Sequence, residues 1–240
     1  MVSIVYPLGK GSRLQNLEIR YSLRSVAEFA ENFDKIFIIG EKPDFLNWSE
    51  TLVHIPFDDR YTPYLNTWLK LREISEQKDV SEKFCFFNDD FFLIDKFDCS
   101  DVPYVTSGLD LHEQYFSYEP LDKIKNGYHK VLRKTMEALR NRKLTTYAFN
   151  THQPVNFEKQ KIAATFQEFS GDLWQHELSF RACYGNLHKI ERTRKPAIVL
   201  GNKIKSMYGH KSFALTNATT YDFAYKILNS FFPEKSLFEV

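Results

Sequence analysis

The stretch KFCFFNDDFF occupies residues 83–92 and is the most informative part of the chain. Its first half is a short, continuous apolar run, which is typical of a strand buried on both faces of a sheet. Two adjacent acids, Asp89 and Asp90, follow this run directly, and phenylalanines flank them on both sides. The stretch therefore predicts a buried strand that carries two carboxylates to the end of a sheet.

Adjacent carboxylates in an apolar frame are costly unless a cation or hydrogen bonds compensate their charge. Open α/β folds place their ligands at the carboxyl ends of the strands, which is where Asp89 and Asp90 would lie. Oxygen ligands of this kind suit Mg²⁺ or Mn²⁺, and such an ion could bridge the two carboxylates and a diphosphate. The alternative is a turn in which the acids only cap the strand.

Strands and helices alternate along the first part of the chain. Further short apolar runs, each bounded by polar residues, occupy residues 4–7, 35–39 and 51–56. Residues 17–32 place apolar side chains at helical spacing, with Asn16 as a candidate N-cap, and residues 64–77 follow as a second helix. A strand, a helix and a strand in succession predict a right-handed crossover and a mostly parallel α/β sheet.

The middle of the chain has a different pattern, which predicts a helical insert or lid. We expect its helices at residues 121–142, 156–169 and 175–183, followed by a closing strand at 212–216 and a helix at 221–232. No linker divides the chain, so we expect one domain. Its parts are an α/β part (1–110), a mainly helical insert (111–195) and a closing strand and helix (196–240).

The charge balance excludes one class of partner. The chain has 240 residues, 32 of them Lys or Arg and 31 Asp or Glu, so it lacks the basic excess that nucleic-acid binding normally needs. Basic residues cluster at 123–143 and 188–195. These clusters are either ordinary solvated surface or patches that attract a phosphate-bearing acceptor or an anionic lipid surface.

The sequence also favours a cytoplasmic location. Its three cysteines show no metal-type spacing, and the first residues lead into a strand pattern rather than a secretory leader. No apolar run approaches the roughly 18 residues of a membrane span. If the basic clusters bind lipid, we expect peripheral association with the inner face of the membrane.

The exit of the first strand is a second candidate ligand site. It reads PLGKGSR at residues 7–13. Gly9 and Gly11 would let backbone amides approach a ligand closely, Lys10 could contact a phosphate, and Ser12 ends the loop. The pattern is not a complete phosphate-binding loop, and an ordinary turn between strand and helix is the alternative.

Two pairs of polar residues lie four positions apart on the predicted helices, so each pair shares a face. Arg20 and Arg24 could clamp a diphosphate, or they could be exposed or structurally paired arginines. Asn66 and Lys70 could contact a base or a phosphate, or they could be surface residues. His152 precedes Gln153-Pro154 in a constrained loop and is a candidate general base or phosphate ligand, unless it is structural.

Three blocks of the chain resemble the Stealth family. That family includes bacterial capsular-polysaccharide phosphotransferases and the catalytic chain of the lysosomal-enzyme N-acetylglucosamine-1-phosphotransferase. The blocks are EIRYSLRS at 18–25 with KIFII at 35–39 and FLN at 45–47, then KFCFFNDDFF at 83–92, and FFPEKSLFE at 231–239. A looser correspondence places His152 and Arg181 where the family has a functional His followed by a functional Arg.

The resemblance implies a glycosyltransferase-A-like, Rossmann-like fold with a UDP-sugar donor. Residues 1–110 would then be the nucleotide-sugar-binding part of a single catalytic domain, 1–240. The implied reaction moves a hexose-1-phosphate, such as a HexNAc-1-phosphate, to a hydroxyl of an acceptor glycan in surface-polysaccharide synthesis. Asp89 and Asp90 would then hold the metal. Arg20, Arg24 and Arg181 would contact phosphate oxygens, and His152 would take the acceptor proton or hydrogen-bond the phosphate.

The chain departs from the family pattern in places that leave the reaction type open. The family's acidic stretch after the first strand is replaced by YPLGKGS at residues 6–12, which contains no acid, and Thr216-Asn217 stands where the family has Asn-Asp. One alternative is a metal-dependent glycosyltransferase that transfers the sugar itself. The other is a non-catalytic glycan-binding protein.

Overall fold

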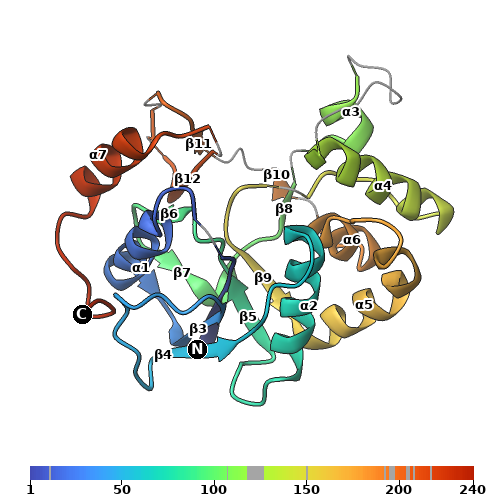
Figure 1. The fold of residues 1–240 in the computed structure, drawn as a ribbon. Helices are drawn as coiled ribbons and strands as arrows, with labels where there is room; N and C mark the ends of the chain where they lie inside the picture. Colours follow the sequence, from blue (N-terminus) through green and yellow to red (C-terminus); the bar gives the residue numbers. More distant parts are fainter. Residues whose placement is uncertain are drawn as a thin grey trace.

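The computed structural model describes residues 1–240 except 11, 107, 118–126, 150, 192, 195–197, 204–205, 208 and 217. Its centre is a five-stranded sheet in the order β4-β3-β1-β5-β9 (Figure 1). These strands are β1 (Val2–Leu8), β3 (Phe33–Gly40), β4 (Leu52–Pro56), β5 (Lys83–Phe86) and β9 (Val155–Glu158). The first four are parallel and β9 is antiparallel to β5, which confirms a mostly parallel, Rossmann-like α/β fold.

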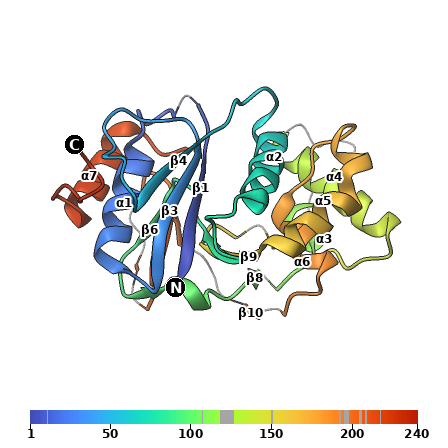
Figure 2. The same ribbon diagram turned by 90° about the horizontal axis from the view of Figure 1, so that it is seen from below.

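The two faces of the sheet are covered by different helices, α1 (Leu17–Phe29) and α2 (Pro63–Glu76). Side chains alternate between the faces along a strand. In β1, Ile4 and Tyr6 therefore pack in the α1 core, whereas Val5 packs in the α2 core. Figure 2 shows α1 and α2 on opposite sides of the sheet. The apolar runs are continuous because both faces are buried.

Helix α1 is shorter than predicted. It ends at Phe29, and Ala30–Glu31 form a short strand, β2, parallel to β7 (Phe97–Asp98). Asn16 occupies the N-cap position, as predicted. It adopts left-handed backbone angles and makes no side-chain capping bond, so this helix start does not use the expected mechanism.

The helical part comprises α3 (Leu111–Tyr115), α4 (Gly127–Asn141), α5 (Lys159–Leu173) and α6 (Phe180–Leu187). The helix predicted at 156–169 starts later, because residues 155–158 alternate buried and exposed side chains and pair with β5. The helix predicted at 175–183 begins at Phe180, where Ser179 Oγ accepts a bond from the Ala182 amide. The start of the helix predicted at 121–142, and parts of both basic clusters, lie outside the described residues.

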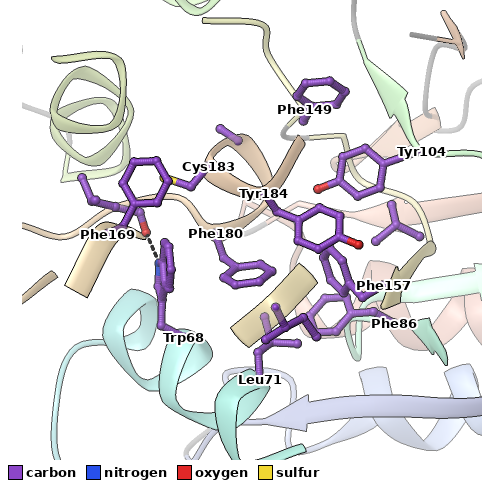
Figure 3. Close-up of a cluster of buried hydrophobic side chains, with 14 of the residues drawn as sticks. Trp68, Leu71, Phe86, Tyr104, Phe149, Phe157, Phe169, Phe180, Cys183 and Tyr184 are labelled. Atoms are coloured by element: carbon purple, nitrogen blue, oxygen red, sulfur yellow. Dashed lines mark hydrogen bonds between the residues drawn. The ribbon is translucent and has the colours of Figure 1, made fainter. Parts of the chain in front are cut away.

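The helical part packs on the sheet through a cluster of aromatic side chains (Figure 3). Trp68 of α2 donates its indole N–H to the Leu178 carbonyl at 2.8 Å, and the rings of Phe157 and Tyr184 lie 4.8 Å apart. A Cβ atom at position 185 would overlap the ring of Phe149, so this position requires glycine. One continuous core therefore joins the sheet to the helices, while the predicted boundaries at 110 and 195 stay predictions.

The end of the chain forms a second, smaller sheet beside the first. Its order is β11 (Ile198–Leu200), β12 (Ser212–Leu215) and β6 (Phe91–Leu93), and α7 (Tyr221–Phe231) follows it. The predicted closing strand and helix are confirmed. Because β6 comes directly after the Asn88–Asp90 turn, the two acids lie where the large sheet meets the small one.

The remaining short elements are β8 (Val105–Thr106), β10 (Thr193–Arg194) and a 3₁₀ turn at Cys99–Asp101. Within the described residues, no helix combines the length and apolar character that a membrane crossing needs.

Candidate active site

An open cleft of about 760 Å³ lies at the carboxyl ends of β1 and β5, with helices of the helical part along its other side (Figure 1). Its walls come from the β1 exit, the first turns of α1 and α2, and the turn that carries the two acids. Helices α4 and α6, the loop around His152 and the end of β12 complete it. This position matches the place where open α/β sheets bind ligands. Asp89, Asp90, His152 and Arg181 all line the cleft, so the structure brings these predicted site residues together.

The acid pair is poorly compensated by the protein. Burial raises the pKa of Asp89 to about 6, and the charge of Glu18 adds to this rise. Burial also raises the pKa of Asp90 to about 8, with the charge of Asp89 as the next cause. The Oδ1 atom of Asp90 is buried and has no hydrogen-bond partner among the described residues. An ionised pair here needs a positive charge that these residues do not fully supply.

The donor set fits a hard divalent cation that also binds substrate. Within the described part of the chain, no group of three or more His, Cys, Asp or Glu residues is placed to hold a metal. Two carboxylates nevertheless suffice for Mg²⁺, which commonly takes one or two carboxylates together with substrate phosphates and water. Asp89 and Asp90, with the partnerless Oδ1 atom, are the residues that would hold such an ion.

Glu18 is a third acid in the cleft that we did not predict as a site residue. Ser12 Oγ donates to its Oε2 at 2.7 Å and accepts from the amides of Leu14 and Asn16 at 3.1 and 3.0 Å. Ser12 thus shapes the β1 exit and orients the Glu18 carboxylate. The sequence feature that could have identified Glu18 as a site residue is its position in the first turn of a helix that starts at the sheet edge.

Arg181 supports the loop that carries His152. Its Nη1 atom donates to the Thr151 carbonyl at 2.8 Å and to the Gln153 carbonyl at 2.9 Å, on either side of the histidine. The guanidinium carbon lies 5.4 Å from the centre of the Phe86 ring. The other terminal nitrogen, Nη2, is buried and finds no acceptor among the described residues.

Burial and charge in the cleft both favour the neutral form of His152. Burial lowers the pKa of His152, and the nearby charge of Arg181 lowers it further. A neutral imidazole has a free nitrogen lone pair, which can accept a proton. Arg181 also attracts the charge of Asp90, although less strongly than burial and Asp89 oppose it.

The β1 exit reaches the cleft as predicted. Gly9, Lys10 and Ser12 line it, while Gly11 lies outside the described residues. The Lys10 ammonium is 3.5 Å from Asp58, and both side chains are mostly exposed. Since an exposed pair of this kind is weak, Lys10 is available to an anion in the cleft.

Arg20 and Arg24 do not line the cleft, and the predicted diphosphate clamp needs correction. Arg24 donates Nε and Nη2 to the two carboxylate oxygens of Glu239, at 2.6 and 2.9 Å. Its Nη1 donates to the Phe232 carbonyl, and Arg20 Nη1 donates to Glu239 at 2.9 Å. The shared face of these arginines is directed at the C-terminal tail, which carries a buried acid to meet them.

Asn66 and Lys70 also have structural partners instead of lining the cleft. The Asn66 amide accepts from the Tyr61 N–H at 3.2 Å and donates to the Tyr61 carbonyl at 2.8 Å. Lys70 donates to the Leu8 carbonyl at 2.7 Å and pairs with Asp59 at 2.8 Å. Lys70 therefore ties α2 to the end of β1 and supports the cleft from outside.

Two tyrosines that we did not predict form an aromatic wall of the cleft. Tyr64, in the first turn of α2, stacks on Tyr128 of α4 with ring centres 6.5 Å apart and an interplanar angle of 22°. Their contact joins helices distant in the sequence, so no local pattern could have paired them.

No family model matches the chain. It is similar to two proteins named capsular polysaccharide phosphotransferase WcwK, both from Streptococcus pneumoniae. One is 34% identical over 84 residues, which cover 32% of this chain and 25% of that relative. The other is 25% identical over 243 aligned residues, covering 84% of this chain and 71% of the relative. The chain thus spans a quarter of the first relative and most of the second, and both similarities agree with the Stealth-like resemblance.

Proposed function

We propose that this chain is a metal-dependent sugar-phosphate transferase that moves a hexose-1-phosphate from a UDP-sugar to a hydroxyl of a glycan. The observation that carries the proposal is the meeting in one cleft of two buried polar atoms that have no partner in the part of the chain that the structure describes. They are Oδ1 of Asp90 and Nη2 of Arg181, one suited to a cation and the other to an anion. A diphosphate bound with a divalent ion has both charges.

Asp89 and Asp90 would hold Mg²⁺ or Mn²⁺, which when bound supplies positive charge to the diphosphate. Transfer of a phosphoryl group depends on alignment and charge stabilisation more than on covalent catalysis. Arg181 Nη2 would donate to an oxygen of the sugar-bearing phosphate, while Nη1 keeps the loop at Thr151 and Gln153 in place. Lys10 would exchange its exposed partner Asp58 for a phosphate oxygen of the donor.

His152 would act as the general base. Its neutral imidazole accepts the proton of the acceptor hydroxyl while the acceptor oxygen forms a bond to the sugar-bearing phosphorus. The bond between that phosphorus and the bridging oxygen breaks, and the oxygen leaves with its electron pair as part of UMP. The charge of Arg181, which lowers the pKa of His152, then favours release of the proton.

The relatives support phosphotransfer over simple sugar transfer. Two proteins similar to this chain carry the name capsular polysaccharide phosphotransferase, which makes a surface polysaccharide the proposed acceptor class. Transfer of the sugar itself, with attack at the anomeric carbon, is the second candidate. Glycosyl transfer remains a candidate because the β1 exit at the cleft contains no acid. A site that only holds the diphosphate would serve either reaction.

Identification of the released nucleotide tests the proposal. The purified chain is incubated with Mn²⁺, an acceptor polysaccharide and UDP-N-acetylglucosamine, UDP-N-acetylgalactosamine or UDP-glucose, and the products are separated. We expect UMP together with a phosphodiester-linked sugar on the acceptor. Release of UDP would assign the glycosyltransferase reaction instead, and binding without consumption of any donor would leave only the non-catalytic alternative.

A further inference from the structure

A second aromatic pair lies outside the cleft, on the surface of the helical part. Tyr61 precedes α2 and Trp174 follows α5, and their ring centres are 5.9 Å apart at 73°. The side chains are 51% and 59% exposed. Figure 2 shows α2 and α5 side by side, and contacts of Trp68 with Phe166 and Phe169 join them further along.

The protein holds Tyr61 in place with a buried side chain. Asn66 is 5% exposed, and both polar atoms of its amide bond the backbone of Tyr61. A buried amide is thereby committed to fixing the position of an exposed aromatic residue. A ring that is rigid before binding loses little conformational freedom when a ligand stacks on it.

The outer pair is close to the cleft along the chain. Tyr61 lies immediately before the first turn of α2, and Tyr64 in that turn lines the cleft and stacks on Tyr128. Two aromatic pairs, one lining the cleft and one exposed, are therefore joined by the short segment from residue 61 to residue 64, and we call Tyr128, Tyr64, Tyr61 and Trp174 the aromatic strip. An exposed aromatic patch that continues a ligand cleft is a candidate for binding the rest of the same ligand.

We propose that the aromatic strip binds the acceptor glycan as a chain of several sugars. The inner rings would take the sugar next to the reacting hydroxyl, and Tyr61 with Trp174 would take a sugar further along. The apolar face of a pyranose carries C–H groups that stack on the negative face of an aromatic ring, while tyrosine hydroxyls bond sugar hydroxyls. The choice of acceptor rests on the proposed function, whereas glycan binding itself does not.

The surroundings favour a glycan over a second protein chain. The outer patch is two rings wide and is bordered by the exposed polar residues Arg60, Gln175 and His176. A stable protein–protein interface buries about 800 Å² on each partner, with an apolar centre. Two exposed rings in a polar setting match a ligand that is itself polar at its edges and apolar on its faces.

The test compares short and long sugars on matched variants. Calorimetry measures binding of disaccharides and hexasaccharides of N-acetylglucosamine, glucose and galactose, and of purified pneumococcal capsular polysaccharides. We expect a long glycan to bind the unmodified chain about tenfold more tightly than its disaccharide. The double variant Tyr61→Ala/Trp174→Ala should lose this length dependence and keep disaccharide binding.

Tyr225→Ala is the matched control. Tyr225 is a 46% exposed tyrosine on α7, which lies far from α2 in both ribbon views (Figures 1 and 2), so its removal should leave glycan binding unchanged. The proposal is overturned if no glycan in the panel shows length dependence, or if the double variant retains it. It is also overturned if the double variant changes only the oligomeric state in sedimentation.

A third variant separates this proposal from the proposed function. Asp90→Asn should retain the length-dependent glycan binding and lose consumption of the donor. If the unmodified chain shows length-dependent binding but consumes no UDP-sugar, the proposed function fails alone. If donor is consumed with equal efficiency on short and long acceptors, and the double variant behaves in the same way, the aromatic strip fails alone.

Discussion

Two charged clusters of this molecule contain the same kinds of group but differ in how fully those groups are bonded. In the C-terminal clamp, formed by Arg20, Arg24 and Glu239, both carboxylate oxygens accept guanidinium N–H groups at 2.6–2.9 Å. In the cleft, Asp90 and Arg181 attract each other's charge, yet one polar atom of each is buried without a partner among the described residues.

The difference separates charged groups whose bonding the fold completes from charged groups whose bonding a ligand could complete. Buried polar groups in native proteins are nearly always bonded, so an exception needs an explanation. The clamp has none to explain, because it joins α1 to the end of the chain and completes its own bonding. The cleft holds two exceptions of opposite sign, and a metal–diphosphate group would satisfy both.

The largest expected effect is a loss of activity without a loss of stability when Asp90 is replaced. Asp90→Asn removes a carboxylate that would hold the cation, and we expect turnover to fall about a thousandfold or more, since metal charge stabilisation is worth several kcal/mol. The melting temperature should stay level or rise, because a desolvated, repelled carboxylate is lost. Turnover and calorimetric melting check these outcomes, and full activity in the variant would remove Asp90 from the site.

The opposite result, a loss of stability without a loss of donor binding, is expected for a substitution in the C-terminal clamp. Glu239→Ala leaves two arginines facing each other without their acid, and breaking a buried ion pair in this way costs about 3–5 kcal/mol of unfolding free energy. The remaining folded protein should keep its KM for the donor. Urea titration gives the stability, and Ser230→Ala, at an exposed site on α7, serves as a control expected to change little. A large rise in donor KM would return Arg20 and Arg24 to the site.

The same comparison explains what the sequence could predict. The strands and the acid pair at 89–90 are local features, readable from an apolar run and its neighbours. The partner of Arg24 is 215 residues away, so spacing showed that Arg20 and Arg24 share a face but not what that face meets. The Tyr64–Tyr128 wall likewise depends on how distant elements assemble. Strand β9 was missed because four alternating residues are too few to distinguish from a helix start.

A third prediction concerns the two terminal nitrogens of Arg181. Arg181→Lys keeps a positive charge but replaces a planar fork by a single ammonium. Its one nitrogen cannot occupy both the position of Nη1, which bonds Thr151 and Gln153, and the separate position of Nη2, which would bond a phosphate. We expect kcat to fall about 10- to 100-fold, with a smaller loss of stability as the loop at His152 loosens. Steady-state kinetics and thermal melting measure both. Unchanged kcat would indicate that the arginine only braces the loop.

The fourth prediction is that the two clusters respond to pH with opposite signs. Folding raises the pKa of Asp90 from 3.8 to about 8, so between these values the folded chain binds more protons than the unfolded chain. Its contribution to the stability of the metal-free protein therefore falls as pH rises through this window, by at most about 1.4 kcal/mol per unit. Although burial works against it, bonding to Arg24 holds the pKa of Glu239 below its usual range. The clamp therefore stabilises the folded protein fully at pH values above the pKa of Glu239 in the unfolded chain. This stabilisation is lost as the pH falls through the pKa of Glu239 in the folded chain.

Urea unfolding in EDTA at about pH 5 and about pH 8 measures how the unfolding free energy depends on the ionisation of Asp90. In Asp90→Asn this free energy should depend less steeply on pH. Added Mn²⁺ should restore stability at the higher pH if the cation binds the ionised pair. A slope that persists unchanged in the variant would assign the effect to other groups.

The smallest expected effect concerns Lys10, at the exposed edge of the cleft, and tests whether this residue binds the donor. Lys10 pairs with Asp58 on the surface, and exposed pairs contribute about 0–1 kcal/mol, so Lys10→Ala should leave the unfolding free energy nearly unchanged. If Lys10 exchanges Asp58 for a donor phosphate, the variant should raise the KM for the UDP-sugar several-fold at low salt, and added salt should reduce the difference. Asp58→Ala is the informative control, because it frees the same lysine and should lower that KM or leave it level. If neither substitution changes the KM, Lys10 is an ordinary surface residue. The charged groups that bind the donor would then be limited to the buried ones, such as Asp90 and Arg181, whose polar atoms lack partners among the described residues.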